Sequence, residues 1–524
     1  MTEGRIILPE DFLFKTTPFD HQRQVFLRSR DEVNFAYLMG MGTGKTKVTI
    51  DVAAWNYQMG RIQFLVVLAP NGVHANWITK ELPAHMPDWT NCISATWASY
   101  LRKKEQMAVD AVMDPDHEGM RVLAFNLEAF KDATRCKGAL LIRKITNSFK
   151  AMMAVDESSK IKTPGAKRTA AIINLGKRAE MRRILTGTPV TNGPLDIYSQ
   201  FSFLDRELLG FDNFQSFKHY YSEWEKESFY NKAKGEMDTY EALVGYRNID
   251  ELTDAIDRHS FRITKEECLD LPPKVYQTRY VEMSVEQRRL YNEIIKESMM
   301  SFEDDEELTV NNVLSKMLRL QQVLGGFVPR EEFGDAEPVD GPNVRLRALM
   351  DVLTESEGKV IIWARFRAEL AAIENAIRKE FGKDSVVSYH GGVSKEDRAE
   401  GMISFQDKES PVRFFVGQQH SGGYGLTLHA ATTVVYYSND FSLEARLQSE
   451  DRAHRIGQDF TVLYIDFECM GTIDTKILLA LREKMNLADM VTRDSKRITG
   501  AEGFDAKKVD PTIANEYLAI AKPA

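Results

Sequence analysis

Near its N-terminus the chain carries the stretch Met41-Gly42-Thr43-Gly44-Lys45-Thr46, between an apolar run at residues 35–39 and a helix-like run at residues 47–57. The apolar run is typical of a buried strand. Glycines let the backbone N–H groups of a turn point inward around phosphate oxygens, and the N-terminus of the next helix adds the positive end of its dipole. The stretch therefore predicts a nucleotide-phosphate loop.

In such a loop the lysine reaches the terminal phosphates and the threonine hydroxyl binds Mg²⁺. These roles would fall to Lys45 and Thr46. The full phosphate-loop pattern also needs a glycine at position 39, where this chain has Met39. On these residues alone, an ordinary strand–turn–helix remains the alternative.

A pair of acidic residues follows another apolar run. Residues 151–155 are apolar and end in Asp156-Glu157. At the end of a parallel strand, Asp156 can hold Mg²⁺, directly or through water, and Glu157 can orient the attacking water. An acidic helix cap after a strand is the alternative for an isolated pair. The presence of a phosphate loop in the same domain favours the metal–phosphate interpretation.

Length and composition are those of a large globular enzyme. A chain of 524 residues is too long for one core, and about three domain-sized units is the expectation. The four cysteines are scattered without a close pair, which argues against a disulfide framework and a zinc module. No apolar run approaches membrane-spanning length, and residues 1–14 do not resemble a signal peptide. We therefore expect a cytoplasmic protein without a membrane partner.

The net charge of −9 gives no overall nucleic-acid signature, but one segment is basic. Between Lys160 and Arg183 there are eight lysines and arginines against one acid, Glu180. This segment directly follows the Asp156-Glu157 pair, where phosphate contacts would be useful. A solvated helix face is the alternative explanation.

Apolar strands alternate with helical stretches in both halves of the chain, which predicts an α/β fold with two parallel sheets. In the first half the expected strands are Phe35–Met39, Phe64–Leu68, Val122–Phe125, Met152–Val155 and Arg183–Thr186. In the second half they are Val360–Trp363, Val386–Tyr389, Phe414–Val416, Val434–Tyr437 and Val462–Phe467. Between them, Phe211–Tyr246 and Ser284–Leu324 are expected to be helical, and Leu271-Pro272-Pro273 to be a linker.

These patterns predict five segments. They are residues 1–205 as a first lobe, 206–270 as its helical insertion, 271–345 as a linker with a helical insertion of the second lobe, 346–480 as the second lobe, and 481–524 as a C-terminal helical extension.

The second half has no phosphate loop of its own and carries two arginines instead. Arg452 and Arg455 are three residues apart, so on a helix they would share one face. Two guanidinium groups on one face suit a triphosphate, as arginine fingers, or they form an ordinary surface salt-bridge pair. The segment Ser421–Gly425 could bring backbone close to a phosphate or ribose, or form only a tight turn.

Together these segments resemble the Swi/Snf-type ATPases of helicase superfamily 2, in the right order over residues 18–481. The stretches that carry the resemblance are Pro18–Gln22, Met41–Thr46, Leu68–Pro70 with Asn76-Trp77 and Glu81, Asp156–Lys162, Leu185–Pro189 with Asn192, Phe203–Asp205, Arg262–Lys265, Leu271–Lys274, Gly422–Leu426 and Arg452–Gln458. The family's phosphate loop itself lacks the first glycine, which explains Met39. The ending Arg-x-His-Arg-Ile-Gly-Gln is highly specific.

The resemblance implies two RecA-like lobes, with ATP and Mg²⁺ as cofactors. ATP would bind between the lobes and contact the residues Gln22, Gly42, Thr43, Gly44, Lys45, Thr46, Gly425, Arg452 and Arg455. Gln22 would read adenine, Thr46 and Asp156 would hold the metal, and the catalytic groups would be Lys45, Asp156, Glu157, Arg452 and Arg455. Nucleic-acid contacts would come from Lys162, Thr188, Arg365 and His390.

The resemblance also implies a motor that tracks double-stranded or branched DNA and remodels forks or junctions, with replication, recombination or transcription proteins as possible partners. Ser159 stands where the family usually has histidine, and Gln418-Gln419-His420 replaces the usual Ser-Thr-Arg type. Three alternatives stay open: an RNA helicase, a remover of a DNA-bound protein such as RNA polymerase, and a nucleotide-controlled binding module without turnover. We expect the chain to be a compact bacterial or phage-type member of the family.

Overall fold

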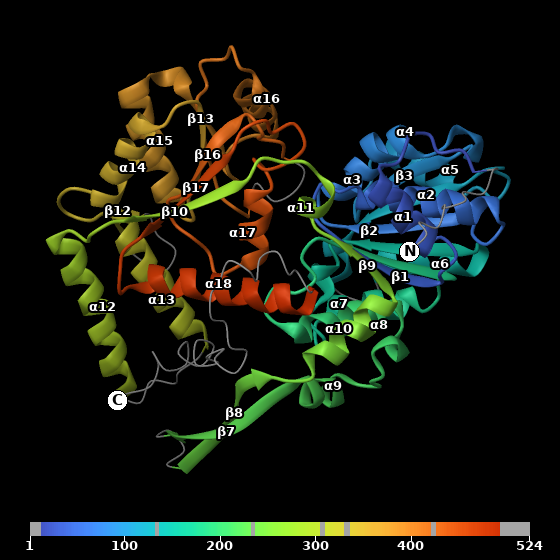
Figure 1. Cartoon of the computed structure of the whole chain (residues 1–524), viewed down its shortest axis with the longest axis horizontal. Helices are drawn as coiled ribbons and strands as arrows, with labels where there is room; N and C mark the ends of the chain where they lie inside the picture. The colour runs from blue at the N-terminus through green and yellow to red at the C-terminus, as the bar shows by residue number, and fades with distance from the viewer. Residues whose placement is uncertain are drawn as a thin grey trace, which may run out of the picture. The chain divides into compact units, whose positions relative to one another are not determined.

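The computed structural model describes most of the chain and divides it into two compact units. The described residues are 12–131, 136–231, 236–303, 310–329, 336–420 and 426–492. Among these, the first unit comprises residues 12–221, 248–269 and 487–492, and the second comprises residues 222–247 and 270–486. Each unit is built around one parallel β-sheet (Figure 1). The predicted α/β class with two parallel sheets is confirmed.

The first sheet has the strand order β3-β4-β2-β5-β6-β1-β9, and all its strands run parallel. Its strands are β1 Asn34–Met39, β2 Phe64–Ala69, β3 Ile93–Trp97, β4 Arg121–Asn126, β5 Ala151–Asp156, β6 Met181–Thr186 and β9 Ser260–Ile263. The five predicted strands are all present, and the edge strands β3 and β9 were not predicted. Edge strands are only partly buried, so the apolar signal that reveals central strands is weak in them.

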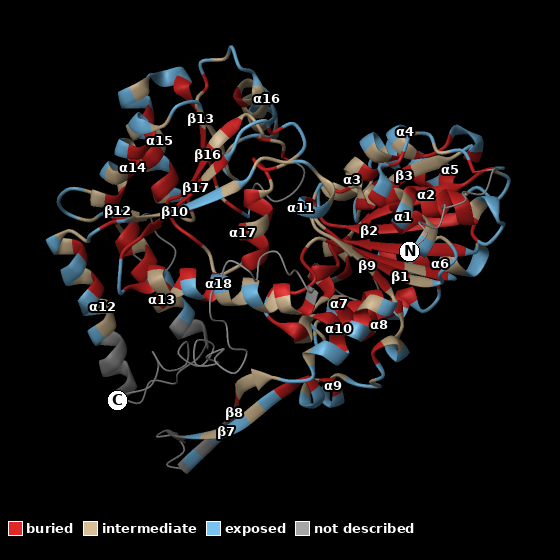
Figure 2. Ribbon diagram, in the orientation of Figure 1, coloured by how far each residue is buried: buried red, intermediate tan, exposed pale blue. Residues whose placement is uncertain are grey.

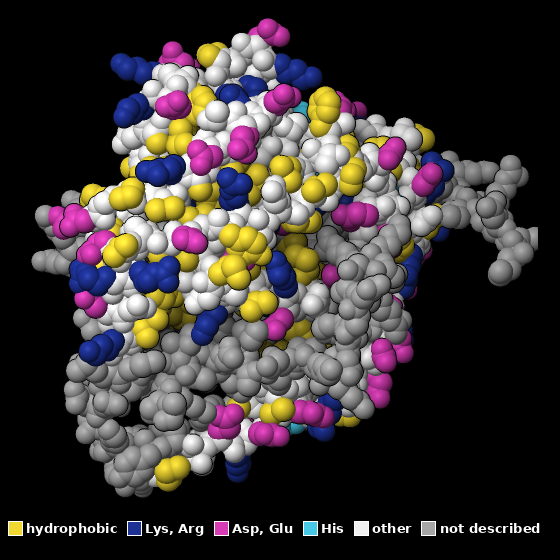
Figure 3. Space-filling view, turned by 60° about the vertical axis from the view of Figure 1, so that its left-hand side comes forward, with side chains coloured by type: hydrophobic (Ala, Val, Ile, Leu, Met, Phe, Trp, Pro, Cys, Tyr) yellow, Lys and Arg dark blue, Asp and Glu magenta, His cyan; other side chains and the backbone are white. Residues whose placement is uncertain are grey.

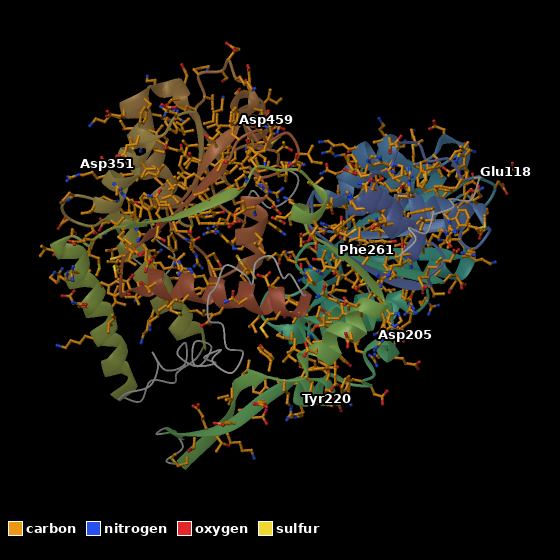
Figure 4. The ribbon with its side chains drawn as sticks, viewed as in Figure 1. Glu118, Asp205, Tyr220, Phe261, Asp351 and Asp459 are labelled. Atoms are coloured by element: carbon orange, nitrogen blue, oxygen red, sulfur yellow. The ribbon has the colours of Figure 1, made fainter. Side chains whose placement is uncertain are left out.

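Helices cover the first sheet, and its central strands are buried on both faces (Figure 2). The helices of this unit are α1 Asp20–Ser29, α2 Lys45–Gln58, α3 Val73–Asn76, α4 Leu82–His85, α5 Lys103–Val112, α6 Lys137–Ser148, α7 Lys167–Gly176, α8 Ile197–Leu204, α9 Phe214–Tyr221, α10 Ile249–Arg258 and α11 Lys265–Cys268. Successive strand residues alternate between two core layers, with Phe35 and Tyr37 in one and Ala36 and Leu38 in the other. Phe261 of β9, labelled in Figure 4, lies with its ring centroid 6.0 Å from the Arg28 guanidinium.

The second sheet has the order β10-β17-β16-β13-β15-β14 and is also wholly parallel. Its strands are β10 Lys274–Tyr280, β13 Lys359–Trp363, β14 Val386–Tyr389, β15 Phe414–Gly417, β16 Ala431–Tyr436 and β17 Val462–Glu468. Its helices are α12 Val285–Glu303, α13 Val310–Gly325, α14 Val344–Glu355, α15 Arg367–Phe381, α16 Lys395–Gln406, α17 Leu443–Glu450 and α18 Ile473–Thr492. All five predicted strands and the helices expected over Ser284–Leu324 are confirmed.

Two segments differ from the expected insertions. The segment expected to be only linker and helix contains β10, which forms the edge of the second sheet, and a short antiparallel pair, β11 Phe327–Pro329 with β12 Ala336–Pro338. Helix α18 passes through residue 481, where we expected a separate extension to begin, and residues 493–524 of that extension lie outside the described residues.

The prediction of helix over Phe211–Tyr246 is wrong for most of that segment. Only α9 is helical, and an antiparallel hairpin follows it, formed by β7 Ser222–Asn231 and β8 Glu236–Tyr246 (Figure 1). The many glutamates favour a helix locally, whereas cross-strand pairs such as Trp224 with Leu243 favour a hairpin. Pairing between strands therefore overrides local propensity in this segment.

Candidate functional site

The phosphate loop joins β1 to α2, and two of its glycines adopt backbone conformations that side chains disfavour. Gly42 has φ +78° and Gly44 has φ +93°, and Gly44 forms the N-cap of α2. A Cβ atom at position 44 would lie 2.1 Å from the Gln22 amide nitrogen. Glycine is therefore required at position 44 both by its left-handed φ and by the close approach of Gln22.

Lys45 is buried within this loop. Its Nζ donates hydrogen bonds to the carbonyl oxygens of Met39, at 2.9 Å, and Gly40, at 3.1 Å. The Thr43 hydroxyl also donates to the Gly40 carbonyl, at 2.7 Å. Both partners of Lys45 are neutral, so a phosphate anion would be a stronger acceptor for its ammonium group. The lysine is thus held at the loop, where its ammonium group can bind a phosphate anion.

Two side chains of α1 bind the same carbonyl of the loop. His21 Nε2 lies 2.7 Å from the Thr43 carbonyl oxygen, and Gln22 Nε2 donates to that oxygen at 3.1 Å. The other end of the Gln22 amide accepts from the Phe19 backbone N–H at 3.0 Å. The structure therefore places Gln22, expected to read adenine, against the phosphate loop. His21 was not predicted, and its position beside Gln22 was its only signal.

Asp156 and Glu157 lie at the carboxyl end of β5 and are both buried. Trp77 Nε1 donates to Asp156 Oδ2 at 2.8 Å, and the Glu157 backbone N–H donates to Oδ1 at 3.0 Å. Burial raises the pKa of Asp156, while the Trp77 hydrogen bond and the positive charge of Lys45 act in the opposite direction. Glu157 has φ +52°, an uncommon conformation for a residue with a side chain. Such backbone outliers are frequent at functional sites.

The oxygen donors of this region fit a magnesium ion. Thr46 offers a hydroxyl and Asp156 a carboxylate, which are the hard ligands that Mg²⁺ prefers. In the described part of the chain, no three His, Cys, Asp or Glu side chains are grouped so as to hold a metal ion by themselves. Magnesium usually takes one or two carboxylates and completes its shell with water and substrate phosphates, so this donor set matches a metal bound together with a nucleotide.

A buried glutamine links this acidic pair to the loop after β6. The Ser158 hydroxyl donates to Gln200 Oε1 at 2.7 Å, and Gln200 Nε2 donates to the Pro189 carbonyl at 2.7 Å. Gln200, on α8, is fully buried and was not predicted. Ser159, which stands where the family usually has histidine, is also buried, and its hydroxyl has no hydrogen-bond partner among the described residues. The hydrogen bond to Gln200 comes from Ser158, the residue before it.

The two arginines of the second unit converge on one carbonyl. Arg452 Nη1 and Arg455 Nη1 donate to the Leu426 carbonyl oxygen, at 3.4 Å and 3.0 Å. The prediction that they share a helical face is wrong, because α17 ends at Glu450 and both residues lie in the turns that follow. Burial lowers the pKa of Arg455, and Asp451 opposes this shift. These turns, rather than a helix, bring the two guanidinium groups together.

Comparisons with known proteins bear on both units. The SNF2-related domain family matches residues 26–325, and the helicase conserved C-terminal domain family matches residues 344–457. The chain belongs to the SNF2-related family. The matched residues include the phosphate loop, the Asp156-Glu157 pair and the two arginines of the second unit.

Several relatives of this SNF2-related chain are known. It is 25% identical over 474 residues to chromodomain-helicase-DNA-binding protein 1-like of Mus musculus, covering 88% of this chain and 48% of the relative. It is 24% identical to the ATP-dependent helicase brm of Drosophila melanogaster over 491 residues, covering 88% and 28%. The chain thus spans half or less of the length of these curated relatives. A solved Sulfolobus solfataricus SWI2/SNF2 ATPase core in complex with dsDNA is 22% identical, with a TM-score of 0.39 over 98% of this chain and 99% of that one.

The predicted nucleic-acid contacts of the SNF2-related chain lie in different surroundings. Lys162 is paired with Thr191 and lies 3.8 Å from Asp196, whereas Thr188 is buried. The two predicted contacts of the second unit, Arg365 and His390, have polar partners. Arg365 Nη1 donates to Gln321 at 2.6 Å, and His390 lies 3.8 Å from Glu374. Gly425, expected at the nucleotide, lies outside the described residues.

The basic segment Lys160–Arg183 is only partly a surface feature. Lys167, Lys177 and Arg178 are exposed, but Arg183 is fully buried and donates hydrogen bonds to backbone carbonyls of the α1–β1 connection. Arg182 Nη2 lies 3.6 Å from Asp205, which is labelled in Figure 4. On the face shown in Figure 3, basic side chains lie among acidic ones. Any phosphate contact from this segment would therefore come from its exposed members.

The structure also bears on membrane association. None of the helices in the described ranges is both long and apolar enough to span a membrane.

Proposed function

We propose that this chain is an ATP- and Mg²⁺-dependent motor that tracks double-stranded DNA and remodels forks or junctions. One observation carries the nucleotide part of the proposal. The phosphate loop, with its left-handed Gly42 and Gly44, follows β1, and the buried Asp156-Glu157 pair stands at the end of β5. Both strands belong to one parallel sheet of a domain that matches the SNF2-related family. The names of its relatives, which include an ATP-dependent helicase and a helicase–DNA-binding protein, support an ATP-driven motor on DNA, and the remodelling of forks or junctions rests on the family resemblance alone.

The first unit supplies the groups that bind and hydrolyse the nucleotide. Lys45 and the N-terminus of α2 would hold the phosphates, because both place positive charge or N–H donors at the loop. Mg²⁺ would supply charge stabilisation to the phosphoryl oxygens, held by Thr46 and Asp156. Glu157 would orient the attacking water. Arg455, with Arg452, would act in turnover as a finger that stabilises transition-state charge.

Duplex tracking would rely on contacts between DNA phosphates and exposed lysines and arginines. Contacts to phosphates are sequence-independent and weaken as salt rises, because counterions compete for the same charges. A motor that pulls duplex DNA through a branch point would move a fork or a four-way junction without separating a simple blunt duplex. We place this activity in the cytoplasm, in keeping with four cysteines that are all free thiols.

Glu157→Gln tests the hydrolytic assignment together with the DNA preference. ATP hydrolysis is measured with single-stranded, duplex, forked and four-way DNA and with RNA, and junction conversion is followed on a gel. We expect duplex or branched DNA to stimulate the wild type most, and Glu157→Gln to bind ATP but lose about 10²-fold or more of its turnover, since the water-orienting carboxylate is gone.

Glu180→Gln, at an exposed position of the same unit, is the matched control and should behave as wild type. Stimulation by RNA alone would contradict the DNA assignment. Junction conversion without ATP would contradict the motor, and retained turnover in Glu157→Gln would reassign catalysis. Release of a DNA-bound polymerase without junction movement would favour the protein-remover alternative.

A further inference from the structure

A buried tryptophan holds the carboxylate that we assign to the metal. Trp77 is 1% exposed, and its indole N–H donates to Asp156 Oδ2 at 2.8 Å. The two residues are 79 positions apart in sequence. In the sequence, the Asn76-Trp77 segment was one of the stretches that carry the family resemblance, with no site role assigned to it. The structure points the Trp77 indole at the acidic end of β5.

The hydrogen bond acts together with a second one to fix the carboxylate. Asp156 Oδ1 accepts from the Glu157 backbone N–H at 3.0 Å, so each carboxylate oxygen has one donor. Each oxygen then keeps lone-pair capacity for one further partner. Because the indole belongs to a packed core layer with residues of α2 and β5, it cannot turn away without disturbing its neighbours. The direction of the remaining lone pairs is therefore set by the core.

We propose that Trp77 is a positioning residue that aims the Asp156 carboxylate at the nucleotide-bound Mg²⁺. The inference rests on the proposed function, because it takes Asp156 as a metal ligand. Donors that orient a metal ligand from behind commonly change metal affinity about 10–100-fold when they are removed. Trp77 touches neither the substrate nor the metal in this role, and its effect passes through Asp156.

The chain contains a matched control in Trp55. This tryptophan is also buried, belongs to the same core layer, and donates its indole N–H to a carboxylate, Asp31, at 3.2 Å. Asp31 has no assigned role, and its side chain is 52% exposed. Trp77→Phe and Trp55→Phe therefore each remove one ring and one indole hydrogen bond from the same core, but only the first reaches the candidate metal ligand.

The experiment measures metal binding rather than activity. Electron paramagnetic resonance of Mn²⁺, used in place of Mg²⁺, gives the metal Kd of the full-length protein with a non-hydrolysable ATP analogue. Nucleotide affinity in the presence of a chelator is measured in parallel. We expect Trp77→Phe to raise the metal Kd about 10–100-fold with unchanged metal-free nucleotide affinity. Trp55→Phe should retain the wild-type metal Kd.

A second form of the protein guards against a simple packing defect. It carries a benzothiophene analogue of tryptophan at position 77, which keeps the ring shape and lacks the N–H donor, and it should show the same rise in metal Kd. A wild-type metal Kd in both position-77 proteins would overturn the positioning role and leave the proposed function standing. An equal loss of metal-free nucleotide affinity, or unfolding of both proteins, would show that Trp77 acts only in packing. If the wild type itself bound no Mn²⁺ with the analogue, the proposed function would fail and this role with it.

Discussion

Asp51 in the first unit and Glu450 in the second are both buried, but their pKa values shift in opposite directions. In the first unit, burial raises the pKa of Asp51 on α2 to about 6 in spite of Lys47, and it also raises the pKa of Asp156. In the second unit, burial again disfavours the charged form, but Lys274 and Arg446 bring the pKa of Glu450 to about 2. Two similar α/β frames thus hold acids of very different strength.

The number of donors around each carboxylate explains the difference. Asp51 Oδ2 lies 2.6 Å from Lys47 Nζ, and its Oδ1 has no hydrogen-bond partner in the part of the chain that the structure describes. Glu450 accepts from Arg446 at 2.8 Å, from the Tyr276 hydroxyl at 2.8 Å and from Lys274 at 3.1 Å. A buried charge is costly unless several groups satisfy it.

The contrast bears on function. Asp156, at the carboxyl end of the first sheet, has a raised pKa, and perturbed acids of this kind gather at functional sites. In the second unit, Lys274, Tyr276 and Arg446 already satisfy the Glu450 carboxylate, in keeping with a structural role for this cluster. The predictions below test each side of this contrast.

The largest effect should come from Lys45→Ala in the first unit. Without the ammonium group that serves the phosphates, we expect DNA-stimulated ATP hydrolysis to be abolished while the fold is retained. Turnover is measured by phosphate release and the fold by circular dichroism, with Lys104→Ala, at an exposed position of α5 in the same unit, as control. Near-normal turnover in a folded Lys45→Ala protein would remove the phosphate-loop assignment.

Arg455→Ala comes next and tests whether the second unit takes part in turnover. A finger arginine acts on transition-state charge, so turnover should fall by about 10³-fold while nucleotide affinity changes little. Single-turnover hydrolysis and equilibrium nucleotide binding separate the two quantities. Arg452→Ala should behave in the same direction, and Arg378→Ala, at a partly exposed site on α15, serves as control. Normal ATP hydrolysis by Arg455→Ala would show that this arginine has no role in turnover and only the structural contact with Leu426.

Arg446→Met should lower the free energy of unfolding more than Lys47→Met does. The change leaves the buried Glu450 and the partly buried Asp466 without their guanidinium partner, and breaking a buried pair costs about 3–5 kcal/mol. Lys47→Met should cost less in slightly acidic buffer, because Asp51, with a pKa of about 6, can take up a proton instead. Urea unfolding of both variants at pH 6 measures the free energies. Equal losses would contradict the proposed difference in charge compensation.

The smallest effect is a pH dependence of opposite sign at the two sites. The pKa of Asp51 is raised in the folded protein, so its contribution stabilises the fold below its ordinary pKa of 3.8 and is lost as pH rises through about 6. The shift corresponds to about 3 kcal/mol. The free energy of unfolding of the wild type relative to Asp51→Asn should therefore fall between pH 4 and pH 6.5, as followed by urea titrations.

For Glu450 the pKa is lowered, so its stabilisation is present above the ordinary value of 4.5 and is lost as pH falls towards 2. Wild type relative to Glu450→Gln should accordingly lose stability on acidification. A pH dependence of the same sign at both positions would break the comparison.

Much of the site was predictable because its signals are local. The phosphate loop needs only neighbouring residues to form, since left-handed glycines followed by lysine and a helix suffice. Asp156 and Glu157 were found because an apolar strand ends at them. The roles of His21, Trp77 and Gln200 were missed, because each acts through a hydrogen bond to a residue that lies far away in the chain. Spacing along the sequence cannot reveal such contacts.

By itself, the sequence determined most of the parallel strands, the phosphate loop, the acidic pair and the family, since each depends on short apolar runs or contiguous motifs. Only the tertiary structure decided which way the functional side chains face. It turned Gln22 towards the loop, buried Arg183 and Thr188, and set Trp77 behind Asp156. It also made a hairpin of β7 and β8. The physical reason is that burial and hydrogen-bond partners come from segments that meet only after folding, and these partners set both the direction and the acidity of a side chain.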